Sequence, residues 1–442
     1  MMNARRRGWK KLPYGWGAAV ALVTVGISAC ASGNAAATTQ VPPSAKQTLI
    51  LWHNGTFSSP VTSLLVKAFE KEHPNITIKM VAEPTGNYFA VLQTTMISHK
   101  GPDIVNLWPA AYMTRFESSL VNLDKYISAA VLARVSGEAY FAKNDSIATA
   151  TYGIPFENQF YNGFYNKSLF RRAGITSLPQ DWTELYADCS ALKKIGVTPI
   201  EYGSASGSGE FPPWEEWSYL LSGALPLTTW NDLLDGRIPY TSQAVVAQVE
   251  RWATLYKKGC TNPNVLTARH AYANFQEGKA GMLFNGSWLS GTFSQSMRSN
   301  VGVLVPPYSP TPNHTVIMET GESYGVPTYS LHRAAAIEFV KFILSPAGEQ
   351  AISASGQAPV VPGYAASNPL ENALLHLVST GQYHVYPMYD NFMQPPVLAV
   401  AAKELDLAFA NQTSAHAAMA ALTSAVNDLS SSQRNVNYRL GG

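Results

Sequence analysis

Charged residues are scarce in this 442-residue chain, in which Asp, Glu, Lys and Arg make up 14% and the formal net charge is +2. It has no basic patch, so nucleic acid is not an expected partner. It also lacks a Gly-x-Ser-x-Gly nucleophile turn, a His-Glu-x-x-His motif, a phosphate-binding glycine loop and a Cys/His cluster. These absences favour a binding protein over an enzyme and predict no metal and no cofactor.

Cysteine is also rare, with only Cys30, Cys189 and Cys260 in the whole chain. Cys30 belongs to the N-terminal segment described next, which leaves two cysteines for the body of the chain. Cys189 and Cys260 could form a disulfide in an oxidising compartment, or they could be two buried thiols. The sequence leaves both alternatives open.

The first 29 residues have the layout of a secretory signal peptide. Five basic residues and no acidic one precede a short apolar stretch, which spans residues 17–29 and is shorter than the roughly 20 residues that a membrane helix needs. Residues 27–30 (Ile-Ser-Ala-Cys) resemble a bacterial lipobox, which predicts lipidation of Cys30; ordinary cleavage with an incidental Cys30 is the alternative. Residues 30–46 carry almost no large apolar side chain and are expected to be a flexible tether.

The body of the chain starts with an alternation of strands and helices. Strands are expected over 48–52, 76–81 and 103–107, with helices over 61–73 and 88–98 between them. This order implies a parallel sheet covered by helices, and such sheets bind ligands at the carboxyl ends of their strands. Further helices are expected over 181–195, 244–258, 334–344 and 400–429, the last with a break near Asn411.

Several motifs, in order along residues 47–360, resemble the family 1 extracellular solute-binding proteins, of which the maltose-binding protein is the best-known member. They include Leu51-Trp52-His53, Gly101-Pro102-Asp103-Ile104-Val105, Tyr165-Asn166-Lys167, and Asn285-Gly286-Ser287-Trp288. The resemblance implies an α/β periplasmic-binding-protein-like fold with two lobes, hinge crossings and a ligand cleft between the lobes. Applied to this chain, it assigns 47–156 plus 286–321 to the N-terminal lobe and 157–285 plus 322–430 to the C-terminal lobe.

A sugar site needs aromatic side chains against the ring faces and planar polar side chains for the hydroxyls. Trp182 and Trp252 lie at helical spacing among apolar neighbours and are expected in the core. The aromatic residues predicted to contact a ligand are Trp108, Trp288, one of Trp214 and Trp217, and Tyr389. The polar residues predicted to contact it are His53, Asn54, Asn87, Tyr88, Glu157, Asn158 and Glu322, with Gly321 at a hinge.

The sequence therefore predicts a monomeric lipoprotein on the outer face of the bacterial cytoplasmic membrane. It would capture a sugar or oligosaccharide and deliver it to the membrane subunits of an ABC importer. One alternative keeps the fold and binds glycerol phosphate, although a phosphate would need Arg, Lys or a helix N-terminus, and only Arg298 and Arg333 lie near the expected cleft loops. A second alternative is a secreted glycoside hydrolase that uses two carboxylates.

Overall fold

The computed structural model describes residues 40–55, 59–84, 87–135, 150–204, 211–293, 295–312 and 314–434. The expected signal peptide and Cys30 lie outside the described residues. The last part of the expected tether, residues 40–46, lies within them and is attached to the body. The backbone N–H of Val41 donates to the carbonyl of Leu331 at 2.9 Å, and the Gln40 side chain donates to the carbonyl of Ser330 at 2.9 Å. Within the described part of the chain, the folded body thus includes residues 40–46, which the sequence assigned to the tether.

The first sheet has the strand order β2-β1-β3-β10-β4. Its strands are β1 (Gln47–Asn54), β2 (Ile76–Glu83), β3 (Ile104–Leu107), β4 (Ile154–Pro155) and β10 (Ser323–Gly325). β1 runs parallel to both β2 and β3, and helices α1 (Ser59–Glu72) and α2 (Tyr88–Ser98) connect them, which confirms the predicted alternation. The carboxyl ends of β1 and β3 therefore lie at one edge of the sheet.

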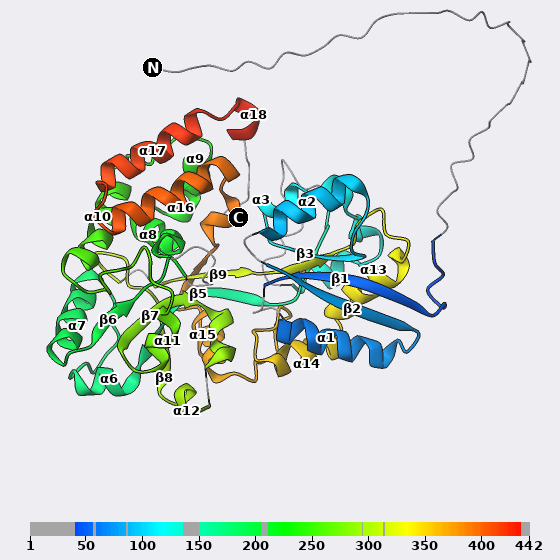
Figure 1. The fold of residues 1–442 in the computed structure, drawn as a ribbon, viewed down its shortest axis with the longest axis horizontal. Coiled ribbons are helices and arrows are strands. Elements are labelled where there is room, and N and C mark those ends of the chain that lie inside the picture. The colour runs from blue at the N-terminus through cyan, green and yellow to red at the C-terminus, as the bar shows by residue number, and fades with distance from the viewer. Residues whose placement is uncertain are drawn as a thin grey trace, which may run out of the picture. The chain divides into compact units, whose positions relative to one another are not determined.

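The second sheet has the order β11-β9-β5-β7-β6, with β8 also paired to β5. Its strands are β5 (Asn158–Asn166), β6 (Thr198–Glu201), β7 (Ala280–Gly286), β8 (Val301–Leu304), β9 (Thr315–Thr320) and β11 (His384–Tyr386). β5 pairs antiparallel with β7, β8 and β9, so this long strand is the centre of the sheet. Figure 1 shows β5 and β9 extending from this sheet toward the first one.

Helices surround both sheets (Figure 1). Those of the first lobe are α1, α2, α3 (Ala111–Thr114), α4 (Ala129–Leu132), α13 (Arg333–Ile343) and α14 (Pro346–Ser355). Those of the second are α6 (Lys167–Arg172), α7 (Trp182–Lys194), α8 (Trp217–Ala224), α9 (Trp230–Leu234), α10 (Gln243–Lys257), α11 (Ala271–Gln276), α12 (Gln295–Arg298), α15 (Pro369–Ser379), α16 (Pro395–Phe409), α17 (Ala415–Asn427) and α18 (Ser431–Arg434). The expected break near Asn411 separates α16 from α17, and Asn411 has a φ of 56°. None of the helices in the described part of the chain combines the length and the apolar character that a bilayer crossing requires.

The larger core lies in the second lobe and is rich in tryptophan. Trp182, Trp217, Trp230 and Trp252 are all buried there, so the prediction for Trp182 and Trp252 is confirmed. A disulfide between Cys189 and Cys260 ties α7 to the segment after α10, with their Cα atoms 5.5 Å apart. Of the two alternatives left open by the sequence, the structure thus shows the disulfide rather than two buried thiols.

Two chain segments cross side by side between the sheets. The backbone N–H of Phe156 donates to the carbonyl of Glu322 at 3.1 Å, and that of Gly321 donates to the carbonyl of Glu157 at 2.8 Å. These bonds continue the β5–β9 ladder into the β4–β10 ladder. A third segment passes nearby, where the carbonyl of Ala358 accepts from the backbone N–H of Asn158 at 2.8 Å.

The predicted assignment of residues after 285 to the lobes is wrong. The segment 286–321 contains β8 and β9, which pair with β5 in the second sheet. The next segment enters the first lobe, because β10 pairs with β3 and β4, and Phe339 of α13 packs edge-on against Phe69 of α1 at 5.3 Å between ring centroids. The chain returns near Ala358, and α16 and α17 belong to the second core.

Candidate functional site

A cavity of about 330 Å³ lies where the paired segments cross. Its wall comes from both lobes, since β1 and β3 end at it from one side and β5, β7 and β9 face it from the other. The lining residues are Asn54, Gly55, Trp108, Pro109, Tyr112, Glu157, Gln159, Tyr161, Phe211, Trp214, Glu215, Asn285, Trp288, Glu319, Gly321, Glu322, Met388, Asp390 and Asn391. Most of them lie within a strand or a short helix, so rigid elements hold them in place.

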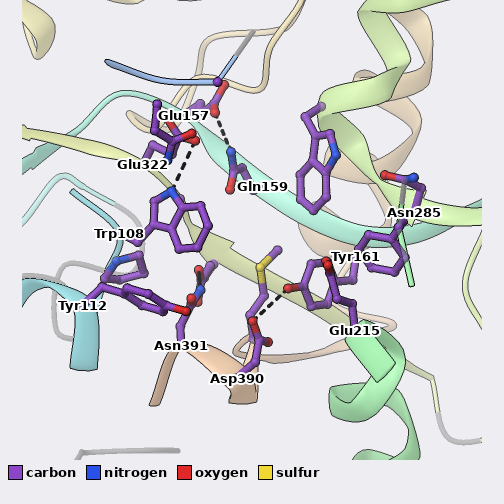
Figure 2. A pocket seen from close by; sticks show the side chains of 18 of the residues that line it. Trp108, Tyr112, Glu157, Gln159, Tyr161, Glu215, Asn285, Glu322, Asp390 and Asn391 are labelled. Carbon is purple, nitrogen blue, oxygen red and sulfur yellow. Dashed lines mark hydrogen bonds between the residues drawn. The ribbon is translucent and has the colours of Figure 1, made fainter. Parts of the chain in front are cut away.

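Two glutamates from the crossing segments mark one side of the cavity (Figure 2). The Gln159 amide donates to Oε1 of Glu157 at 2.6 Å, and the indole N–H of Trp108 donates to Oε1 of Glu322 at 3.4 Å. The amide of Asn106, from β3, donates to the other oxygen of Glu322 at 3.0 Å. Glu322 therefore joins a crossing segment to the carboxyl end of β3.

A second set of acidic and amide side chains lies across the cavity (Figure 2). The hydroxyl of Tyr161 donates to Oδ2 of Asp390 at 3.0 Å, and the amide of Asn391 donates to Glu319. Asp390 and Asn391 belong to the short helix η7 (Tyr389–Phe392), and Glu319 belongs to β9. All three are buried, yet they line the cavity.

Aromatic rings form much of the wall between these groups. Trp108 lies edge-on to Tyr112, with 4.9 Å between ring centroids, and Trp288 lies edge-on to Tyr161 at 5.8 Å. Trp214, in the short helix η4 (Pro213–Glu216), completes the set of indoles. Unlike the four core tryptophans, these three indoles keep part of their surface exposed. Their exposed surface is available to stack on a flat ligand.

The acidic groups of the cavity have perturbed pKa values. Burial raises the pKa of Glu157 well above its usual range, and the neighbouring charge of Glu322 raises it further. Burial followed by the charge of Asp390 likewise raises the pKa of Glu319 and Glu215. The pKa of Asp390 itself is raised by burial to about 6, although its bond from Tyr161 opposes this shift. A carboxyl whose pKa is raised keeps its proton to a higher pH, and while protonated it can donate as well as accept hydrogen bonds.

Seven of the predicted site residues line the cavity. They are Asn54, Trp108, Glu157, Trp214, Trp288, Gly321 and Glu322. The structure thereby separates Trp214, which faces the cavity, from Trp217, which is 1% exposed and packs near Tyr240 in the core.

The other predicted residues lie elsewhere, each for a local reason. Tyr88 is buried and its hydroxyl bonds to both the backbone N–H and the carbonyl of Asn106, and Asn158 donates to the carbonyl of Pro359 at 2.8 Å. Tyr389 bonds to the hydroxyl of Tyr240 at 2.8 Å inside the core. His53 is buried at the end of β1, where desolvation lowers its pKa, and Asn87 is exposed before α2.

Sequence reasoning missed several lining residues, above all Gln159, Tyr161 and Glu319. They lie on β5 and β9, which read as ordinary strand segments, and alternation along β5 could have indicated that Glu157, Gln159 and Tyr161 share one face. Asp390 and Asn391 follow a core tyrosine, and no local pattern marks them. Their place in the site depends on η7 folding back against β9.

The family described as bacterial extracellular solute-binding protein matches residues 54–350. A binding protein of Brucella abortus is 26% identical over 265 residues, which are 58% of this chain and 61% of that protein. The multiple sugar-binding protein of Streptococcus mutans is 23% identical over 297 residues, which are 63% of this chain and 66% of that protein. The chain thus spans about three fifths to two thirds of the length of these relatives.

Solved structures show the same fold over nearly the whole body. A chitin oligosaccharide binding protein has a TM-score of 0.72 at 23% identity, covering 87% of this chain and 98% of its own. Maltose-bound MalE3 of T. maritima has a TM-score of 0.69 at 18% identity, covering 86% of this chain and 99% of its own. At these identities the likeness establishes the predicted two-lobe α/β fold.

Proposed function

This chain belongs to the family of bacterial extracellular solute-binding proteins, and from that premise we propose that it captures a sugar or oligosaccharide between its lobes and delivers it to an ABC importer. The observation that carries the proposal is the cavity at the crossing segments, where three partly exposed indoles lie among carboxyl and amide groups. Indoles stack on the apolar faces of a sugar ring, and planar polar groups bond its hydroxyls. The chitin-, maltose- and multiple-sugar-binding proteins named above support a carbohydrate ligand.

The chemistry of the cavity does not favour the phosphate alternative. Among the described residues that line it, none is lysine, arginine or histidine, while five are acidic. Neither Arg298 nor Arg333 lines it. A phosphate monoester would find no cationic side chain among these residues, and every ionised carboxylate would repel it. The hydrolase alternative has no support from the family, whose members are described as binding proteins.

Within the proposal, ligand binding closes the lobes about the paired segments at 155–158 and 320–323. Few backbone bonds join the lobes at this place, so a modest rotation of the crossing residues would suffice. The lipid on Cys30 would hold the receptor at the outer face of the membrane, near the importer's membrane subunits. We propose that it acts there as a monomer.

Thermal-shift screening of the purified protein against maltose, cellobiose, xylobiose and chitobiose tests the ligand class. A ligand at about 100 times its Kd stabilises the folded state by about 2.7 kcal/mol and raises the melting temperature. Trp108→Ala and Trp288→Ala should each reduce the shift, whereas Trp182→Phe, in the core, should lower the baseline melting temperature without reducing the shift. If no carbohydrate binds, or if a bound one is cleaved to products, the proposal fails.

A further inference from the structure

The cavity is more acidic than a neutral sugar requires. Its five carboxyl groups come from five separate places: the two crossing segments, η4, β9 and η7. Among the described lining residues no basic side chain balances them. Arg115 is exposed and lies over the ring of Tyr112, 4.9 Å from its centroid, but it does not line the cavity.

Three of these carboxyls have an oxygen without a hydrogen-bond partner among the described residues: Oε2 of Glu157, Oε2 of Glu319 and Oδ1 of Asp390. Glu157 is 2% exposed, and its Oε1 accepts from Gln159, but its Oε2 has no hydrogen-bond partner among the described residues. A buried polar atom without a partner costs free energy, so such atoms usually have a function or an unseen partner. The charge of Glu322 beside it adds to this cost. A positively charged group placed here would satisfy the free oxygen and cancel the repulsion.

The aromatic walls suit the same group. A protonated amine over an indole or phenol face is attracted by the ring, and more strongly so in a desolvated site. Trp108 donates to Glu322 and packs edge-on against Tyr112. Tyr161 donates to Asp390 and packs edge-on against Trp288. A metal ion is a poorer occupant, because no group of three or more His, Cys, Asp or Glu side chains in the described residues is arranged to hold one.

We propose that the carbohydrate bound here carries a protonated amine, as an amino sugar does, and that Glu157 and Glu322 receive this amine; the inference rests on the proposed sugar-binding function. The remaining lining groups fit the rest of such a molecule. Asn54, Asn285 and Asn391 offer amides to hydroxyls, and the indoles offer flat apolar surface. A simple polyamine has no hydroxyl groups for these amides to bind.

The test compares three disaccharides that share rings and linkage and differ only at the second carbon. Cellobiose has a hydroxyl there, chitobiose an N-acetyl group, and the glucosamine disaccharide a protonated amine. Calorimetry at about pH 6, where an aliphatic amine is charged, should give the amine at least about tenfold tighter binding than either neutral sugar. The preference should weaken between about 50 and about 300 mM salt.

Two variants locate the effect. Glu157→Gln keeps the shape of the side chain and removes its charge, and it should reduce the ratio of the affinity for the amine to that for a neutral disaccharide by about tenfold. Glu349→Gln is the matched control, because Glu349 is similarly buried, accepts from the backbone N–H of Val361 at 3.5 Å and does not line the cavity. It should leave the preference unchanged.

The outcomes separate this inference from the proposed function. If chitobiose or cellobiose binds as tightly as the amine, the inference is overturned and the sugar receptor stands. If Glu157→Gln leaves the preference intact in a folded protein, the assignment to Glu157 is overturned. If putrescine binds and none of the three disaccharides does, both the inference and the sugar-binding function fail.

Discussion

Replacing Gly286 by alanine should push the indole of Trp288 out of its place in the ligand site. Gly286 has φ −114° and ψ 163°, an extended conformation that alanine adopts without strain. A Cβ atom at this position would lie 2.1, 2.1 and 2.3 Å from three atoms of the Trp288 ring, whereas ordinary contacts are 3.4–4 Å. The ring, which lines the cavity, must therefore move by more than about 1 Å.

The expected effect follows from what the ring contacts. Trp288 packs edge-on against Tyr161 and lies 6.0 Å from Phe211 between centroids. Aromatic contacts of this kind contribute about 0.5–1.5 kcal/mol each, so a displaced indole should weaken sugar binding by about tenfold. The cost in unfolding free energy should be about 1 kcal/mol, the low end for overpacking, since the ring is free to yield.

Calorimetry with the disaccharide that shifts the wild-type melting temperature provides the assay. Gly291→Ala is the matched control, because it lies in the same segment, η6 (Ser287–Thr292), and its Cβ would meet nothing within 4 Å. The double mutant Gly286→Ala/Trp288→Ala should bind no more weakly than Trp288→Ala alone. If Gly286→Ala costs as much affinity without the indole as with it, the steric reasoning is refuted.

Three further predictions concern stability. Cys189→Ser/Cys260→Ser should lower the unfolding free energy by about 4 kcal/mol, since the disulfide closes a loop of 71 residues. Equal unfolding free energies for the oxidised wild type and the double variant in urea denaturation would contradict this. Asp181→Ala removes the N-cap of α7 and should cost about 1 kcal/mol by the same assay, while Asp181→Asn should cost little. The pKa of Glu216 is raised by burial from 4.5 to about 8, so the folded protein keeps a proton that the unfolded chain loses. The contribution of protonated Glu216 to the unfolding free energy is therefore full below about pH 4.5 and is lost as the pH rises to about 8. Glu216→Gln should flatten the curve of unfolding free energy against pH in this range. An unchanged slope would contradict the assignment to Glu216.

Local patterns were sufficient for most elements of the fold. The apolar run at 48–52, the helix after it and the strand at 76–81 appear as β1, α1 and β2, because strand and helix periodicity depend on neighbouring residues. The cap of α7 is equally local, with Asp181 accepting from the N–H of Glu184 at 2.9 Å. The motifs that predicted two lobes also lie within such stretches.

The choice among tryptophans required the tertiary structure. Trp214 and Trp217 are three residues apart with similar neighbours, yet η4 leaves the first at the cavity and α8 buries the second. The assignment of 286–321 failed for a related reason. Nothing within β8 and β9 indicates that both pair with β5 rather than with the first sheet.

By itself the sequence determined the strands, the helices, their caps and the family to which they belong, because hydrophobic periodicity and capping act between near neighbours. Only the tertiary structure decided which side chains share the cavity. Its bonds join residues far apart in the chain, such as Trp108 with Glu322 and Tyr161 with Asp390. Such contacts arise when the two sheets fold around their crossing segments, and no pattern within a single segment encodes them.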